Sequence, residues 1–163
     1  MPFIAEKFPT YDAFANASME DIYGSKLDSA VAYEANTFKS ILLLNKGNGN
    51  FEKQALPAAV QTAPTLSVVF HDLNQDGFED AILAGTIYHT EVETPRWDSG
   101  TGLVLFSNQR DGYTIPSPSS NIYISGDVKD LETIQLENQT ILIAGRNDNL
   151  LAVYELNGNR IAK

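Results

Sequence analysis

The spacing of the hydrophobic residues changes near residue 38. From Ser40 onward they form short runs rich in Ile, Leu, Val, Phe and Tyr, and each run ends at Gly, Asn, Asp or Pro. Such runs between turn-forming residues are typical of an antiparallel all-β fold built from hairpins. We expect the main turns at residues 46–50, 76–77, 111–112 and 157–159.

The residues before this point have helical spacing instead. Thr10 is placed to cap one short helix, and Ser18 with Asp21 has the pattern of a weak capping box for a second. Gly24 is a suitable end for that helix, and residues 26–33 predict a third helical segment. Helices this short are marginal alone, so we expect residues 1–38 to be a cap or insertion that packs on a larger body.

The β region contains an internal repeat. The segment 41–51 recurs loosely as 103–113 and, with a shorter turn, as 151–159. The strand signal at 81–85 recurs at 141–145. A period of about 60 residues with four strand signals describes one blade of a β-propeller. Chance similarity among the hairpins of a β-sandwich is the alternative.

We therefore expect a partial propeller of about two and a half antiparallel blades at residues 39–163. Its expected parts are an outer hairpin at 39–57, a full blade at 64–118 and a further blade at 126–162. An open stack of blades exposes two apolar sheet faces. The chain is therefore expected to self-associate, to cover these faces with the helical segment, or to be completed by the blades of a longer chain.

The sharpest chemical signal lies at residues 72–80. Side chains with oxygen atoms occupy positions 1, 3, 5 and 9 of this segment, and glycine occupies position 6. This is the pattern of a loop that binds a hard cation, and a donor set made only of oxygen favours Ca²⁺. The expected ligands are Asp72, Asn74, Asp76, the carbonyl of Phe78, and Asp80.

An EF-hand is excluded by one position, because its loop needs Glu at position 12, which is Leu83 here. Residues 81–84 instead form an apolar strand signal, and residues 68–70 form another before the loop. The loop is therefore expected to be the turn of a β-hairpin. An acidic turn without metal is the alternative. His71, at the end of the first strand, is expected to make a structural hydrogen bond.

The hairpin pattern Asp-x-Asn-x-Asp-Gly-x-x-Asp at 72–80, followed by a short apolar strand, resembles the FG-GAP/VCBS repeat, the blade of integrin-α-like β-propellers. The turn at 45–51 resembles a turn between the outer strands of those blades, and residues 90–102 are similar to a loop near the C-terminus of bacterial VCBS-repeat proteins. The resemblance covers about residues 39–157. It implies calcium binding and a role in adhesion or ligand binding outside the cell.

This resemblance also implies the C-terminal blades of a longer exported protein, at an extracellular, cell-surface or periplasmic location. The chain begins without a signal peptide, which such a fragment would explain. Residues 127–133 lack the Asp-Gly turn, so we expect no ion there, and Asn48 stands where the family often has Asp. One calcium site is therefore expected.

Composition narrows the possible partners. The formal net charge is −10, which argues against nucleic acid as a ligand because a basic face is needed to displace counterions from phosphates. The chain has no cysteine, which excludes thiol catalysis, disulfides and Cys-ligated zinc. No apolar run approaches the roughly 20 residues of a membrane-spanning helix. A further alternative for the function of the chain is an intracellular scaffold protein that does not bind calcium.

A second candidate site is the loop at residues 90–102. A charged loop with one aromatic ring can form the edge of a site for a protein or glycan ligand, for example by stacking on a sugar. Paired carboxylates could also serve a carbohydrate-active enzyme, although no convergent pocket is visible and we expect no catalysis. A solvated loop is the alternative. The candidate residues are Glu91, Glu93, Arg96, Trp97 and Asp98.

Overall fold

The computed structural model describes residues 2–109, 112–116, 122–157 and 160–162. The chain divides into two compact units, Met1–Phe38 and Lys39–Lys163. The turns expected at 111–112 and 157–159 fall partly outside the described residues. Each unit is considered by itself below.

The first unit is helical. Its elements are α1 (Pro2–Lys7), α2 (Tyr11–Ala15), α3 (Met19–Tyr23) and the 3₁₀ helix η1 (Gly24–Ser29). The predicted caps are confirmed: the Ala13 N–H donates to Thr10 Oγ1 (3.1 Å), and Ser18 and Asp21 form a reciprocal capping box. The hydrogen bonds from Ser18 lower the pKa of Asp21. Gly24 ends α3 with a positive φ of 56°.

The third helical segment predicted at 26–33 is wrong in extent. A 3₁₀ helix ends at Ser29, and residues 30–40 form neither helix nor strand. Of the apolar residues whose spacing predicted a helical face, Leu27 is only partly buried, Ala30 is exposed and Val31 is 77% exposed. A short helix without a packed face gains too little to offset its nucleation cost.

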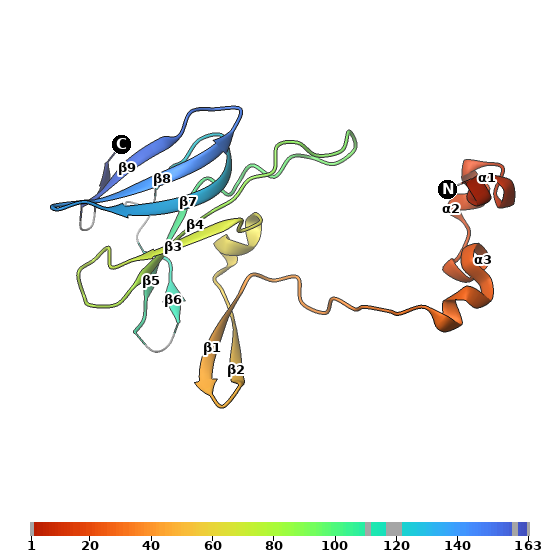
Figure 1. Ribbon diagram of the computed structural model, residues 1–163, viewed down its shortest axis with the longest axis horizontal. Coiled ribbons are helices and arrows are strands. Elements are labelled where there is room, and N and C mark those ends of the chain that lie inside the picture. The colour runs from red at the N-terminus through yellow and green to blue at the C-terminus, as the bar shows by residue number, and fades with distance from the viewer. Residues whose placement is uncertain (1, 110–111, 117–121, 158–159, 163) are drawn as a thin grey trace. The chain divides into compact units, whose positions relative to one another are not determined.

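The second unit is all-β, as predicted, and consists of three antiparallel sheets (Figure 1). The described strands form no closed barrel. A two-stranded sheet contains β1 (Ile41–Gly47) and β2 (Asn50–Ala55), and the 3₁₀ helix η2 (Ala58–Thr62) follows. A four-stranded sheet contains, in order, β3 (Ser67–His71), β4 (Asp80–Ala84), β5 (Leu103–Ser107) and β6 (Tyr113–Thr114). The third sheet contains, again in chain order, β7 (Asp127–Gln135), β8 (Thr140–Asn147), β9 (Ala152–Asn157) and β10 (Arg160–Ala162).

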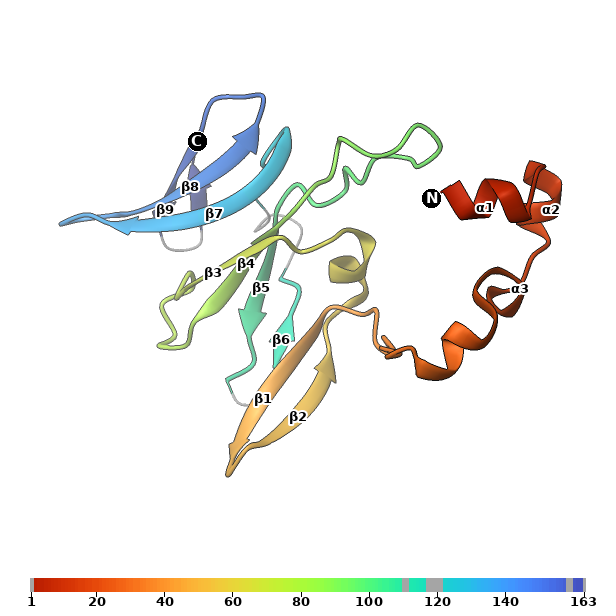
Figure 2. The ribbon, with the colours of Figure 1, turned by 45° about the vertical axis from the view of Figure 1, so that its right-hand side comes forward.

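The main core lies between the two four-stranded sheets, where β3 and β4 lie against β7 (Figure 2). Strand β4 is buried along its whole length because both of its faces are covered. Ile82 and Ala84 belong to the main core, whereas Ala81 and Leu83 belong to a second cluster with Val60 of η2. Side chains alternate between the two faces of a strand, so the continuous apolar run of β4 fills both clusters.

Polar groups also join the two four-stranded sheets. Ser67 Oγ donates to Asp130 Oδ1 (2.8 Å) and accepts the Leu131 N–H (3.0 Å). Next to β4, Thr86 exchanges backbone and side-chain hydrogen bonds with Val128 at 3.0 and 2.7 Å. The sheets are therefore held together by directional bonds as well as by apolar burial.

Two glycines permit a close backbone approach behind β4. The Gly85 N–H donates to the Gly100 carbonyl (3.0 Å), and a Cβ placed on Gly100 would lie 1.8 Å from the Gly85 carbonyl oxygen. Real Cβ atoms essentially never come this near to another atom, so the 90–102 loop can return to β5 only with glycine at this point.

We predict that Gly100→Ala lowers the free energy of unfolding by about 1–3 kcal/mol, because the backbone of the loop must move away from Gly85. Gly145→Ala is the matched control, since its nearest neighbour would be 3.7 Å away. The control should change stability by about 0.5 kcal/mol or less. Urea unfolding followed by circular dichroism measures both, and equal effects of the two substitutions would contradict the close approach.

Candidate metal centre and ligand loop

The segment 72–80 joins β3 to β4 as the turn of an antiparallel hairpin, as predicted. The strands pair as far as His71 with Asp80, so residues 72–79 form the loop. The first strand lies where residues 68–70 predicted it and the second where 81–84 did. Leu73 is buried in the main core and anchors the loop at its start.

Side-chain oxygens organise the backbone of this loop. The two carboxylate oxygens of Asp72 accept the Asp76 N–H (3.1 Å) and the Gly77 N–H (2.8 Å). Asn74 Oδ1 also accepts the Asp76 N–H (3.0 Å), and Asp76 Oδ1 accepts the Phe78 N–H (2.9 Å). These local bonds are of the Asx-turn type and hold the loop in a tight curve.

Two residues of the loop have left-handed backbone conformations. Gln75 has φ of 61° and Gly77 has φ of 89°. A Cβ on Gly77 would meet nothing within 4 Å, so glycine is favoured there by its φ and not by space. Gly77, the glycine at position 6 of the predicted loop, therefore has the positive φ that lets the backbone turn at this point.

Asp80 differs from the other acidic residues of the loop because it is completely buried. One carboxylate oxygen accepts the Leu73 N–H (3.0 Å), and the other accepts the Ser107 N–H (2.9 Å). Asp80 thus connects the start of the loop to the end of β5. The partner on β5 was not predicted, since nothing in the sequence identifies which backbone N–H a buried carboxylate will reach.

The donor atoms fit a hard cation in kind. Asp72, Asn74, Asp76 and Asp80 present carboxylate or amide oxygens within one hairpin turn, and carboxylate oxygens keep further lone pairs after accepting one hydrogen bond. As they stand, however, no three His, Cys, Asp or Glu side chains in the described ranges form a group that could hold a metal ion. The predicted set of Ca²⁺ ligands therefore depends also on the side chain of Asn74 and on the backbone carbonyl of Phe78.

The loop at 90–102 leaves the sheet after β4 through a short bridge. Ile87 and Trp97 exchange backbone hydrogen bonds at 2.9 and 2.8 Å, which closes the loop between them. Glu91 and Glu93 are exposed beyond this bridge, and no hydrogen bond or ion pair joins their side chains to Arg96 in the described part of the chain. Within the described residues, the structure therefore does not join these two glutamates to Arg96 by a side-chain bond.

The remaining three predicted residues are neighbours at the base of the loop. Arg96 Nε donates to Asp98 Oδ2 (3.0 Å), and the Arg96 guanidinium lies 4.8 Å from the centre of the Tyr88 ring. Trp97 is 48% exposed. Tyr88 was not predicted as part of this group. The sequence signal that could have identified it is an aromatic residue opposite Arg96 on the other arm of the hairpin.

An ion pair between the buried Asp127 and the partly exposed Lys129 supports the base of this loop. Asp127 Oδ1 lies 2.9 Å from Lys129 Nζ and 3.3 Å from the Tyr88 backbone nitrogen, which donates to it. Thr86 and Asn147 also donate to the Asp127 carboxylate, at 3.2 Å each. Burial acts to raise the pKa of Asp127, but the hydrogen bonds and charge of Lys129, with the other donors, outweigh it and lower the pKa.

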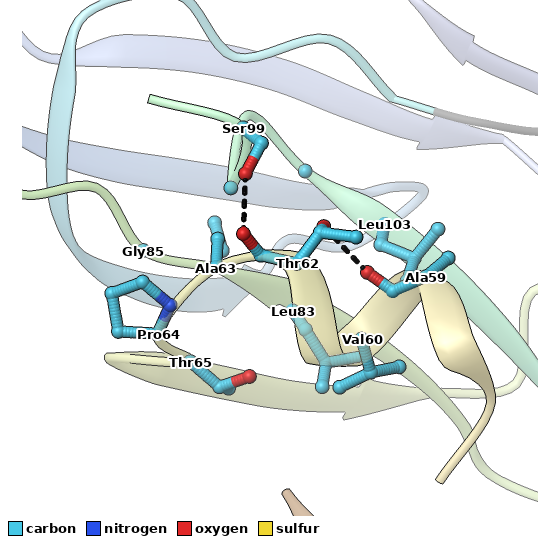
Figure 3. Close-up of a pocket in the computed structure, with 13 residues that line it drawn as sticks. Ala59, Val60, Thr62, Ala63, Pro64, Thr65, Leu83, Gly85, Ser99 and Leu103 are labelled. Atoms are coloured by element: carbon cyan, nitrogen blue, oxygen red, sulfur yellow. Dashed lines mark hydrogen bonds between the residues drawn. The ribbon is translucent and has the colours of Figure 1, made fainter. Parts of the chain in front are cut away.

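A small cavity of about 160 Å³ lies between η2 and the start of β5 (Figure 3). Ser99 Oγ donates to the Thr62 carbonyl (2.8 Å), and Thr62 Oγ1 donates to the Ala59 carbonyl (2.9 Å), so these two hydroxyl groups are engaged by the backbone. The residues that line the cavity carry no carboxyl, imidazole or amino group. The cavity therefore contributes no acid–base pair.

In comparisons with known proteins, no family model, no curated protein and no solved structure matches the chain. Within the described ranges, no helix has the length and apolarity needed to cross a membrane.

The lowered pKa of Asp127 predicts a dependence of stability on pH. A carboxyl group with a depressed pKa in the folded state stabilises the fold above its unfolded pKa of about 3.9, and this contribution is lost as the pH falls through the folded pKa. Asp127→Asn should therefore lower the free energy of unfolding at neutral pH and weaken its fall between about pH 5 and pH 3. Urea unfolding at several pH values measures this.

Asp148→Asn is the matched control, because Asp148 lies near the same end of β8 and its pair with His89 (3.2 Å) is exposed to solvent and therefore contributes little to stability. The free energy of unfolding of the Asp148→Asn variant should depend on pH as that of the unchanged chain does. If Asp127→Asn also followed that curve, the ion pair with Lys129 would not be a source of stability.

Proposed function

We propose that residues 72–80 bind one Ca²⁺ ion and that the chain is a non-catalytic calcium-binding segment of a β-propeller, serving adhesion or ligand binding outside the cell. The observation that carries this proposal is the hairpin turn in which oxygen-bearing side chains already shape the backbone around a glycine of positive φ. The ion would supply charge neutralisation and cross-linking of the turn, with no part in a reaction.

Each predicted ligand has a distinct part in this proposal. Asp72 and Asp76 supply charged oxygens on the exposed side of the turn, and Asn74 supplies a neutral one. Phe78 contributes its backbone carbonyl. Asp80 is already fixed between Leu73 and Ser107, so it joins the turn to the sheet.

The charges of the turn support a cation. Asp72, Asp76, Glu79 and Asp80 lie within nine residues, and the ion pairs of Lys46, Arg96 and Lys129 are made with other carboxylates. Carboxylates at such short separations repel one another, and the net charge of −10 adds to this repulsion. A bound divalent cation removes the local repulsion.

Two features support the propeller interpretation. Both four-stranded sheets are simple antiparallel meanders in which the strands follow chain order, and they pack against each other through one face. The three sheets also occupy the successive repeats that the sequence contains, with β1–β2 in the place of β5–β6 and β9–β10. The alternative of a β-sandwich would instead require the repeats to be unrelated hairpins.

A location outside the cell is part of this proposal and sets the affinity that we expect of the site. Extracellular calcium modules bind with a Kd of roughly 10⁻⁴–10⁻³ M, and calcium there is present at about 2 mM. With a Kd near 0.1 mM, about 2 mM calcium would stabilise the fold by roughly 1.8 kcal/mol. That is a substantial share of the stability of a small domain.

We predict that EDTA lowers the melting temperature of the chain in calcium-containing buffer and that Asp76→Ala removes this response, because Asp76 is an exposed ligand. Glu137→Ala is the matched control: it removes a carboxylate from the exposed turn between β7 and β8 and should leave the response unchanged. Differential scanning calorimetry with and without 2 mM Ca²⁺, that is about the extracellular concentration, measures all three.

Asp80→Ala separates the structural bonds of the turn from calcium binding. It leaves the buried Leu73 N–H and the Ser107 N–H without an acceptor, so it should lower the free energy of unfolding by about 2–5 kcal/mol even in EDTA. Asp76→Ala should have little effect in EDTA. An identical melting temperature of the unchanged chain with calcium and with excess EDTA would contradict the proposed site.

A second candidate function is carbohydrate binding by the base of the 90–102 loop. It is favoured by the half-exposed Trp97 ring and by the guanidinium of the preceding residue, Arg96, which Asp98 holds over the Tyr88 ring. An exposed aromatic ring can stack on a sugar, and a fixed guanidinium can donate hydrogen bonds to hydroxyl groups. The glutamates of the loop tip have no part in it.

If this second function is correct, a glycan array should show binding by the chain that Trp97→Ala abolishes and Glu93→Ala leaves intact. The glutamate variant is the matched control, because it lies on the same loop beyond the Ile87–Trp97 bridge. Binding that persists in Trp97→Ala, or no binding to any glycan, would exclude this function.

A further inference from the structure

Strand β1 has one edge that no strand of the described chain covers. It pairs with β2 from Ile41–Ala55 to Gly47–Asn50, and the sheet contains no third strand. A free edge presents a row of backbone N–H and C=O groups that can pair with another strand. This site lies wholly within the second unit of the chain.

The other repeats of the chain show what covers the same edge elsewhere. Strands β5 and β9 occupy the place of β1 in their own sheets, and each is flanked by a strand on both sides. The inner neighbours are β4, with the sequence DAILA, and β8, with the sequence TILIAGRN. Both run antiparallel to their partners and both are short aliphatic strands that follow a hairpin turn.

The two strands of the β1–β2 hairpin differ in chemistry. Strand β2 carries Glu52 and Lys53, and charged side chains are a common protection against unwanted strand pairing. The first four residues of β1 are Ile-Leu-Leu-Leu, without a charge. The edge of β1 is therefore the one suited to accept a further strand.

An apolar groove runs beside this edge. It has a volume of about 210 Å³ and is lined by Ile41 and Leu42 of β1 and by Val68, Phe70 and Leu105 of the neighbouring sheet. Val68 is 42% and Phe70 is 48% exposed, whereas Val69, which lies between them in β3, belongs to the core. A strand added to β1 would place alternate side chains in this groove.

We propose that the free edge of β1, with the groove beside it, is a strand-addition site for an aliphatic β-hairpin supplied in trans by another polypeptide. The inner strand of that hairpin runs antiparallel to β1 and has the composition of β4 and β8: four consecutive small or aliphatic residues without charge. Backbone hydrogen bonds to β1 provide affinity, and the contacts with Val68 and Phe70 select apolar side chains. This site does not depend on calcium, and its test is carried out in EDTA.

A synthetic peptide of residues 127–145, labelled with a fluorophore, is the probe, because it carries the β7–β8 hairpin and lacks the 72–80 loop. Fluorescence anisotropy with the full chain should show saturable binding. A peptide with Leu142→Pro and Ile143→Pro should bind at least about tenfold more weakly, since adjacent N–H groups point to opposite edges of a strand and proline removes both. Equal binding of the two peptides, or none of the first, would overturn the proposal.

Variants of the chain locate the binding surface. Phe70→Ser should weaken peptide binding by about tenfold, which corresponds to about 1.4 kcal/mol, whereas Phe51→Ser should leave it unchanged. Phe51 is the matched control because it is an exposed phenylalanine near the tip of the same hairpin, outside the groove. If the peptide bound the Phe70→Ser variant as tightly as the unchanged chain, the groove would not be the binding surface and the proposal would be overturned. If this variant does not fold, the comparison with the proline-substituted peptide still tests the proposal.

Sedimentation equilibrium of the chain alone tests whether a second copy of the chain, instead of another polypeptide, covers the edge of β1. A monomer across the concentrations used supports a partner in trans. Dimerisation that blocks the peptide and is lost in Phe70→Ser would show that a second copy covers the edge, and it would overturn the proposal as stated.

Discussion

The buried carboxylate of Asp80 is the group on which the geometry of the candidate metal centre depends. It accepts backbone N–H groups from both the start of the loop and the end of β5, so it fixes the hairpin turn to the sheet before any ligand is considered. A buried charge is costly unless it is hydrogen-bonded, and two backbone donors satisfy that need. The exposed part of the loop is then curved by Asp72, Asn74 and Asp76 around this fixed point.

This division explains how one short segment can be both structural and able to bind an ion. The buried end of the loop contributes to the packing between sheets through Leu73, and its exposed end carries the excess of negative charge. An ion bound at the exposed end would act on the same hairpin that supplies β4, the strand buried in both apolar clusters. Ion binding and stability of the unit are therefore coupled in the proposal through a single strand.

The elements that the sequence predicts best are those with a local cause. The caps at Thr10 and Ser18, the hairpin at 72–80 and the alternation of strands and turns all depend on residues close to one another in the chain. The features it does not reveal depend on residues that meet only after folding. Examples are the contact of Gly85 with Gly100 and the bond from Ser107 to Asp80. The helix expected at 26–33 was wrong for the related reason that helical spacing alone does not supply a surface to pack against.

Isothermal titration calorimetry of the chelator-treated full chain with CaCl₂ measures whether the turn of the β3–β4 hairpin binds a hard divalent cation. We expect one Ca²⁺ to bind per chain, with a Kd of roughly 10⁻⁴–10⁻³ M. Mg²⁺ should bind more weakly, because it demands a smaller octahedral shell and gives up its water reluctantly. A titration with no heat of binding at calcium concentrations up to about 10 mM, well above that range, would show that the turn does not bind Ca²⁺ as proposed.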